Sequence, residues 1–130
     1  MVYTSSTLSL AALEQLAHLV HLLPLQDLVA VPAEIPPSVA IVHVQATALP
    51  PDWRSPIPPV RLAEIGSDWI DAGRSAVLAV PSVIVPQELN YLLNPQHPQF
   101  KRSRIGRPEP FYFDPRLGKR HPGSSWYDPR

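Results

Sequence analysis

Apolar residues recur at helical spacing in two stretches of the chain, and these stretches predict its two main helices. In residues 8–23, leucine, alanine and valine return every three or four positions and leave only a narrow polar strip. Three hydroxyl residues precede this stretch as N-cap candidates, and Pro24 ends it. The second helix is predicted over residues 59–72, with Gly73 as its stop. A short third helix is predicted at residues 86–93, because proline is favoured in a first helical turn.

Short apolar runs rich in valine and isoleucine predict β-strands around these helices. Prolines separate the runs: the chain has 18 of them in 130 residues, and each fixes φ and removes a backbone donor. The predicted strands are residues 2–4, 27–35 with an interruption at Pro32, 39–46, 76–80, 101–105 and 111–113. Strands and helices mixed in this way predict an α+β fold, with a mixed β-sheet core and two main helices.

Length and composition are those of one small globular domain. A chain of 130 residues with 45% hydrophobic and 17% charged residues is too apolar for a disordered protein. The absence of cysteine excludes a disulfide framework, a thiolate zinc site and a cysteine nucleophile. No apolar run reaches about 18 residues, and no basic region precedes the first apolar stretch. We therefore expect neither a membrane span nor a signal peptide, and a cytoplasmic location.

The charges balance overall but are unevenly placed. Residues 1–100 contain 3 basic and 8 acidic residues, whereas residues 101–130 contain 8 basic and 3 acidic residues. This pattern predicts a folded domain over residues 1–117 and a basic, flexible tail over residues 118–130. A basic tail can contact nucleic acid. Neither interleaved aromatic residues nor a nucleic-acid motif accompanies it, so a solvated tail is the preferred interpretation and direct nucleic-acid binding is not expected.

Glu14 is the most informative polar residue of the first predicted helix. The helix is apolar on most sides, so this carboxylate either faces a cleft or is paired. Only a protonated His18, one turn further on, is within helical reach. A cleft carboxylate can stabilise a developing positive charge or orient a water, and a surface glutamate is the alternative. His21 shares the face, but the spacing differs from that of zinc-binding helices, so no metal site is predicted.

Two later stretches also carry candidate polar side chains. Ser82 follows a predicted buried strand, a place where sites are often built. It has no glycine elbow and no Ser/His/Asp set, so a hydrogen-bonding or turn role fits better than a nucleophile. Asn90, Asn94 and His97 cluster among prolines, where they either bind a polar ligand or satisfy the loop backbone. No glycine-rich phosphate-binding loop is present.

A series of short motifs resembles the RES domain family. The motifs occur in family order over nearly all of residues 2–117. They are Val2-Tyr3-Thr4-Ser5-Ser6, Leu10-Ala11-Ala12-Leu13-Glu14, His18-Leu19, Leu49-Pro50-Pro51-Asp52-Trp53, Gly66-Ser67-Asp68-Trp69, Val80-Pro81-Ser82, Pro86, Asn90-Tyr91-Leu92-Leu93-Asn94-Pro95, His97-Pro98, Phe111, Phe113-Asp114 and Arg116-Leu117. Each motif alone is weak, and together they are specific.

The resemblance implies a fold and a function. RES proteins are toxins of bacterial Res/Xre toxin–antitoxin pairs, and their fold is similar to that of ADP-ribosyltransferase toxins. The implied activity is cleavage of NAD at the nicotinamide–ribose bond, with NAD as substrate and no cofactor. Attack by water, as in an NAD glycohydrolase, and attack by phosphate, as in an NAD phosphorylase, both remain open. The implied partner is a DNA-binding Xre-type antitoxin that covers the active site, and a homodimer is implied by the resemblance alone.

The resemblance also assigns site residues. The family is named for an arginine, a glutamate and a serine; Glu14 matches the glutamate and Ser82 the serine, and Tyr3 matches a tyrosine before the glutamate. Glu14 would stabilise the oxocarbenium-like ribose, and Tyr3 would stack on the nicotinamide ring. Ser82 would bind the ribose or fix the Glu14 carboxylate. Asn90 is a further expected substrate-binding residue.

The chain departs from the family pattern at its N-terminus. The name-giving arginine belongs to a glycine-rich segment that would precede Met1, and the first basic residue here is Arg54. Either Met1 is an internal methionine taken as the start or the gene is truncated. We expect the chain to be weakly active or inactive and to expose an open sheet edge. Arg54, Arg61 and Arg74 are candidates to replace the arginine in space.

Two other classes of function compete with the NAD-degrading toxin. One is a non-catalytic RES remnant that still binds an Xre-type antitoxin. The other is a nucleic-acid-binding protein that acts through the basic tail, for which binding would depend steeply on salt.

Overall fold

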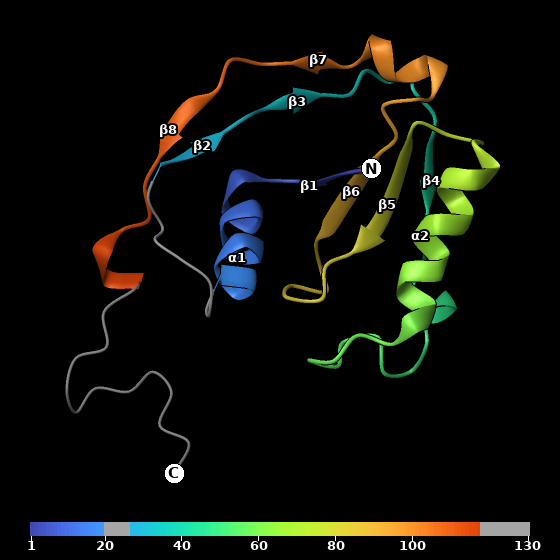
Figure 1. Cartoon of the computed structure of the whole chain (residues 1–130), viewed down its shortest axis with the longest axis horizontal. Coiled ribbons are helices and arrows are strands. Elements are labelled where there is room, and N and C mark those ends of the chain that lie inside the picture. Colours follow the sequence, from blue (N-terminus) through green and yellow to red (C-terminus); the bar gives the residue numbers. More distant parts are fainter. Residues whose placement is uncertain (20–26, 118–130) are drawn as a thin grey trace.

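A mixed four-stranded sheet forms the centre of the computed structural model, which describes residues 1–19 and 27–117 (Figure 1). The strand order is β1-β6-β5-β4, with β4 and β5 parallel and the other pairs antiparallel. The strands are β1 (Val2–Ser5), β4 (Ile41–His43), β5 (Val77–Pro81) and β6 (Leu89–Leu93). With two α-helices beside this sheet, the predicted α+β class is confirmed.

The two α-helices lie where the apolar spacing predicted them. Helix α1 covers Leu8–Leu19, and the remainder of that prediction falls on residues 20–23, outside the described part. Helix α2 covers Val60–Ala72. Three short 3₁₀ turns add to them, at Ala46–Ala48, Pro98–Arg102 and Pro115–Leu117.

Gly73 ends α2 in the left-handed backbone conformation, with φ of 62°. Its N–H donates to the Trp69 carbonyl, 3.1 Å away, which closes the last turn. Nothing lies within 4 Å of a Cβ built at this position. We therefore expect Gly73→Ala to lower the free energy of unfolding by about 1 kcal/mol through backbone strain alone. Urea unfolding measures this loss of stability. Ala72→Gly is the control, because it probes helix propensity and not the positive φ. An unchanged unfolding midpoint for Gly73→Ala would contradict the prediction.

The predicted short helix at residues 86–93 is wrong, because this segment forms the central strand β6. Pro86 lies in a turn before the strand and does not open a helix. β6 pairs with β1 on one edge and with β5 on the other. Leu92 and Leu93 are 6% and 2% exposed and point to opposite faces of the sheet. Pairing on two edges and burial on two faces outweigh the local proline signal.

The sheet is covered on both faces by apolar side chains. On one face, Leu78 and Leu92 pack against Trp69 of α2. The Trp69 indole N–H donates to the buried Ser75 hydroxyl at 2.8 Å, so the large ring is buried without losing its polar partner. On the other face a second cluster is formed by Val39, Ala76, Val77 and Leu93. Helix α2 therefore packs against one part of the sheet, and polar groups occupy the part nearest α1.

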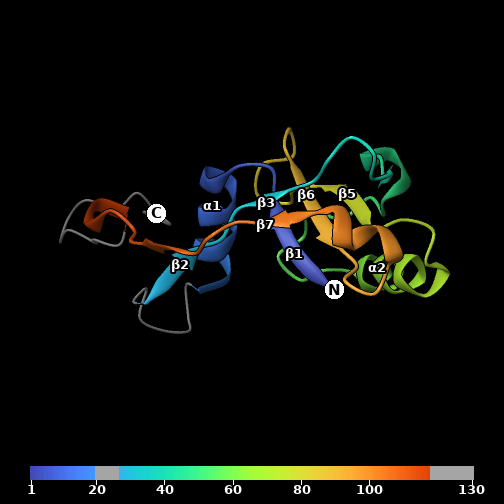
Figure 2. The same cartoon turned by 90° about the horizontal axis from the view of Figure 1, so that it is seen from above.

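A long two-stranded arm runs beside β1 and α1 (Figures 1 and 2). In it β2 (Leu28–Ala30) pairs with β8 (Glu109–Phe111), and β3 (Ala33–Glu34) pairs with β7 (Arg104–Ile105). The break between β2 and β3 confirms the predicted interruption at Pro32. Gly106 fits there only because it lacks a side chain, since a Cβ would meet Pro32 Cγ at 2.5 Å.

The remaining predicted strands hold with altered bounds. β4 and β7 are shorter than expected, β8 has the predicted length but lies two residues earlier, and β5 begins and ends one residue later than predicted. At the end of the described chain, the Arg116 guanidinium donates to the Asp114 carboxylate and holds the pKa of Asp114 below its ordinary value. The predicted tail at 118–130 lies outside the described residues. Within the described part, no helix is long and apolar enough to cross a membrane.

Candidate active site

Three predicted residues from three different elements meet at the open end of the sheet. Glu14 comes from α1, Ser82 directly follows β5, and Asn90 lies in β6. The Ser82 hydroxyl donates to Glu14 Oε1 at 2.7 Å, and Asn90 Nδ2 donates to the same oxygen at 2.7 Å. One carboxylate oxygen is thus held by two side chains that lie 68 and 76 residues further along the chain.

The Ser82 side chain is fully committed to contacts within the protein. Its residue is 0% exposed. Besides donating to Glu14, its Oγ accepts hydrogen bonds from the backbone N–H groups of Ile84 and Val85, at 3.1 and 3.0 Å. A hydroxyl has one donor and two acceptor positions, so all three are used. This geometry matches the second of the two expected roles, fixing Glu14, and leaves no free lone pair for a ribose.

Asn90 is also held within the protein, by a residue that the sequence did not single out. The Ser5 hydroxyl of β1 donates to Asn90 Oδ1 at 2.7 Å. This bond turns the Asn90 amide nitrogen towards Glu14 and forms a relay from Ser5 through Asn90 to the carboxylate. Strand alternation was the available signal, because Ser5 follows Tyr3 by two positions and shares its face of β1. Substrate binding by Asn90 stays a prediction.

The second carboxylate oxygen of Glu14 is the open one. The Glu14 side chain is 19% exposed, and His18 Nε2 lies 3.8 Å from Oε2 on a side chain that is 79% exposed. His21, the third member of the polar strip, lies outside the described residues. In residues 1–19 and 27–117 no three acidic, histidine or cysteine side chains gather as metal ligands do. Glu14 is thus a fixed, half-buried carboxylate with one oxygen available to a ligand.

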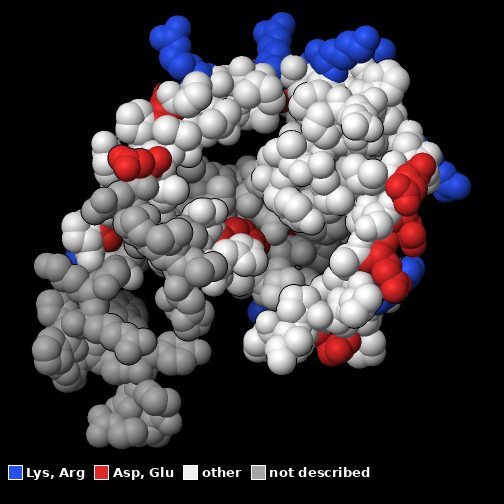
Figure 3. Space-filling model, viewed as in Figure 1, with Lys and Arg blue, Asp and Glu red and all other residues white. Residues whose placement is uncertain are grey.

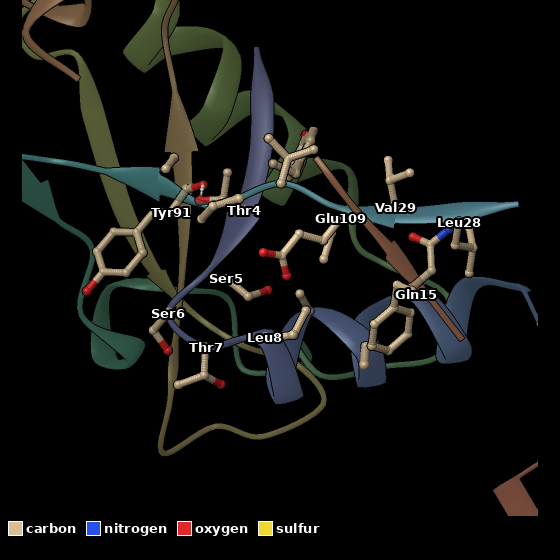
Figure 4. Close-up of a pocket in the computed structure, with 18 of the residues that line it drawn as sticks. Thr4, Ser5, Ser6, Thr7, Leu8, Gln15, Leu28, Val29, Tyr91 and Glu109 are labelled. Atoms are coloured by element: carbon tan, nitrogen blue, oxygen red, sulfur yellow. Dashed lines mark hydrogen bonds between the residues drawn. The ribbon is translucent and has the colours of Figure 1, made fainter. Parts of the chain in front are cut away.

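Tyr3 lies beside this network and not within it. Tyr3 is 74% exposed and shares the face of β1 that carries Ser5. With Ser5 it lines a cavity of about 770 Å³ between β1, α1 and the arm (Figure 4). An exposed ring next to a pocket is available for stacking on a planar ligand, as the resemblance implies for Tyr3.

The three arginines named as candidates for the role of the family arginine occupy different places. Arg54 Nε donates to the Val83 carbonyl at 3.1 Å, directly after Ser82. Arg61 is paired on α2 with two carboxylates, at 3.3 and 3.5 Å. Arg74 is exposed just beyond the end of α2. Among these three, Arg54 is the one fixed to the loop that carries Ser82.

In this α+β fold, a serine fixes a carboxylate beside the mixed β-sheet. Such a site is suited to stabilising positive charge. The sequence comparison is consistent with this: the RES domain family matches residues 1–114. The chain belongs to the RES domain family, as the motifs predicted.

Relatives in three bacterial genera cover most of the chain. A protein named Toxin Res from Yersinia enterocolitica is 38% identical over 117 residues, which are 89% of this chain and 76% of the relative. Toxin Res from Photorhabdus laumondii is 39% identical over 78% of this chain and 64% of its own length. A protein named Prs ADP-ribosylating toxin from Sphingobium is 39% identical over 90% of this chain and 74% of its own length. That name is consistent with the expected fold similarity.

Proposed function

We propose that this chain is a RES toxin that breaks the nicotinamide–ribose bond of NAD. The observation that carries the proposal is the state of Glu14, with Oε1 fixed by Ser82 and Asn90 and Oε2 open. Family membership and the toxin names of the relatives support it. A carboxylate fixed before the substrate arrives stabilises charge that develops in the transition state without reorganising at that moment.

The proposed reaction moves positive charge from the nicotinamide ring to the ribose. As the N-glycosidic bond breaks, its electron pair stays on the nicotinamide nitrogen, and the ribose becomes oxocarbenium-like. Glu14 Oε2 faces this cation, Tyr3 stacks on the nicotinamide, and neutral nicotinamide leaves. Water or phosphate then bonds to the anomeric carbon; attack by water releases its proton to solvent and yields ADP-ribose.

The proposed partners follow from the family. An Xre-type antitoxin would neutralise the toxin in the cytoplasm, and a homodimer is the proposed assembly. The relatives named Toxin Res are consistent with a toxin–antitoxin pair.

Release of nicotinamide from NAD by the purified chain tests the proposal. We expect slow release of nicotinamide, because the first basic residue of the chain is Arg54. ADP-ribose is the expected second product, or phosphorylated ADP-ribose when phosphate is added, and chromatography separates the two. A folded chain that releases no nicotinamide in either buffer would overturn the enzymatic proposal. Binding of an Xre-type antitoxin without turnover would then support the non-catalytic alternative.

Arg54 is the proposed contact for the diphosphate of NAD. Its Nε donates to the Val83 carbonyl, in the loop that follows Ser82. This bond fixes the orientation of the guanidinium, whose other N–H groups can donate to a diphosphate. We expect Arg54→Gln to raise KM for NAD about 10-fold, the loss expected for one charge-assisted contact, with kcat little changed. Initial rates over a range of NAD concentrations measure both constants. Arg74→Gln is the matched control, and equal effects in both variants would contradict the assignment.

A further inference from the structure

The Glu14 carboxylate fixes the direction of the hydrogen bonds that connect it to Ser5. A carboxylate only accepts hydrogen bonds, so the atom of Asn90 that contacts Glu14 Oε1 must be the amide nitrogen. The amide oxygen of Asn90 then faces Ser5 and accepts the single hydroxyl proton of that residue, at 2.7 Å. Ser5 therefore has no proton left to donate to a ligand.

Strand pairing holds this arrangement in place on both sides. Ser5 lies directly opposite Asn90 in the register of β1 and β6. In the neighbouring pair, the Thr4 hydroxyl donates to the Tyr91 carbonyl at 2.8 Å. On its other edge, Asn90 is paired with Val80 of β5. The Ser5 hydroxyl is thus oriented by the sheet before any ligand arrives.

The two lone pairs of the Ser5 oxygen are open to the cavity. Ser5 lines this space, and its side chain points into it from β1 (Figure 4). Within residues 1–19 and 27–117, no group donates a hydrogen bond to Ser5 Oγ. In the same view Glu109 reaches towards Ser5, but its carboxylate also only accepts. The surface is hollowed between the arm and the sheet, so a ligand can enter here (Figure 3).

We propose that Ser5 Oγ accepts a hydrogen bond from the carboxamide N–H of nicotinamide and so selects dinucleotides that carry a carboxamide. Tyr3 and Ser5 lie two positions apart on one face of β1, about 7 Å along the strand. This separation suits a ring that stacks on Tyr3 and extends its substituent towards Ser5. The inference rests on the proposed NAD cleavage and names the feature of the substrate that the site recognises.

The proposed contact completes a chain of hydrogen bonds that all run in one direction. The carboxamide donates to Ser5, Ser5 donates to Asn90, and Asn90 donates to Glu14. Hydrogen bonds in such a chain polarise and strengthen one another. An acetyl group in place of the carboxamide has no N–H and loses the contact. A carboxylate in the same place has no proton either, and it faces the negative charges of Glu14 and Glu109.

Three dinucleotides test the proposal: NAD, its 3-acetylpyridine analogue and nicotinic acid adenine dinucleotide. Titration calorimetry gives their dissociation constants, and nicotinamide release from NAD is measured beside it. We expect Ser5→Ala to weaken binding of NAD about 5–10-fold more than binding of the acetyl analogue, the effect of one hydrogen bond. Loosening of Asn90 affects both ligands alike, so the ratio isolates the carboxamide contact. Equal losses for both ligands would overturn the proposal.

Two further variants separate hydrogen bonding from charge. Ser5→Thr keeps the hydroxyl and is expected to keep the preference for NAD over the acetyl analogue. We expect the wild type to bind NAD about 10-fold or more tightly than nicotinic acid adenine dinucleotide, and Glu109→Gln to retain most of this preference. If Glu109→Gln abolishes it and Ser5→Ala does not, repulsion by Glu109 explains the selectivity and the proposal is wrong.

The two readouts distinguish this inference from the proposed activity. Binding that prefers NAD through Ser5, without nicotinamide release, would support the inference and contradict the proposed cleavage. Release of nicotinamide without a preference that depends on Ser5 would do the reverse. A folded chain that binds none of the three dinucleotides would overturn both.

Discussion

Replacing Glu14 with glutamine is expected to lower kcat for NAD cleavage by about 10²–10³-fold, the loss seen when one preorganised electrostatic contact is removed. Glutamine keeps a carbonyl oxygen that can still accept from Ser82 and Asn90, so the network and the fold are retained. What is lost is the negative charge at the open position, because Oε2 becomes an amide nitrogen that donates. The effect therefore falls on kcat more than on KM.

Nicotinamide release at saturating NAD measures this loss, and a thermal melt shows whether the variant is folded. His18→Gln is the matched control, because His18 lies 3.8 Å from Glu14 on a largely exposed side chain and is expected to change kcat little. A folded Glu14→Gln protein that keeps more than a tenth of the activity would show that Glu14 does not stabilise the transition state.

The second large effect is expected from Ser82→Ala, on stability and activity together. The change removes the acceptor used by the N–H groups of Ile84 and Val85 and the donor that fixes Glu14. These bonds are part-buried, with Ile84 38% exposed. Each lost bond costs about 0.5–1.5 kcal/mol, so we expect the free energy of unfolding to fall by about 1–3 kcal/mol. The released Glu14 side chain lowers kcat by about 10-fold or more, because the carboxylate loses its fixed position.

Ser103→Ala provides the control for this second prediction. The Ser103 hydroxyl is buried and has no hydrogen-bond partner within the described part of the chain. Its removal is expected to leave stability unchanged or raise it slightly. Urea unfolding of both variants gives the comparison. Similar unfolding midpoints for Ser82→Ala and the wild type would show that the three bonds of Ser82 contribute little.

Sequence patterns located the helices well, because α1 and α2 bury a recurring apolar face that the spacing reveals. They failed at β6, where the strand exists only because β1 and β5 lie on either side of it. Short proline-flanked segments carry little local preference, and their long-range partners decide their structure.

The site was predicted to the extent that its residues belong to motifs. Ser82 contacts Glu14, which is one of the two roles that the resemblance implied for it. The contact between Asn90 and Glu14 was not predicted, and the catalytic and substrate-binding roles stay predictions. Ser5 was missed, because a serine in a strand has no signal of its own until its partner across the sheet is known. The place of Arg54 in space could not be predicted for the same reason. Its contact with Val83 joins two loops, and no spacing rule connects them in the sequence.

The long sequence separation within the Glu14 network delays the formation of the site during synthesis. Glu14 leaves the ribosome early, but its two partners lie 68 and 76 residues later. At about 5–20 residues per second, those partners follow after about 4–15 s. β1 likewise cannot pair until β6 has been synthesised, and pairings between segments so distant in the sequence are slow to form. A nascent chain that stops before residue 90 has the glutamate but not the site, so interrupted translation yields no intact centre.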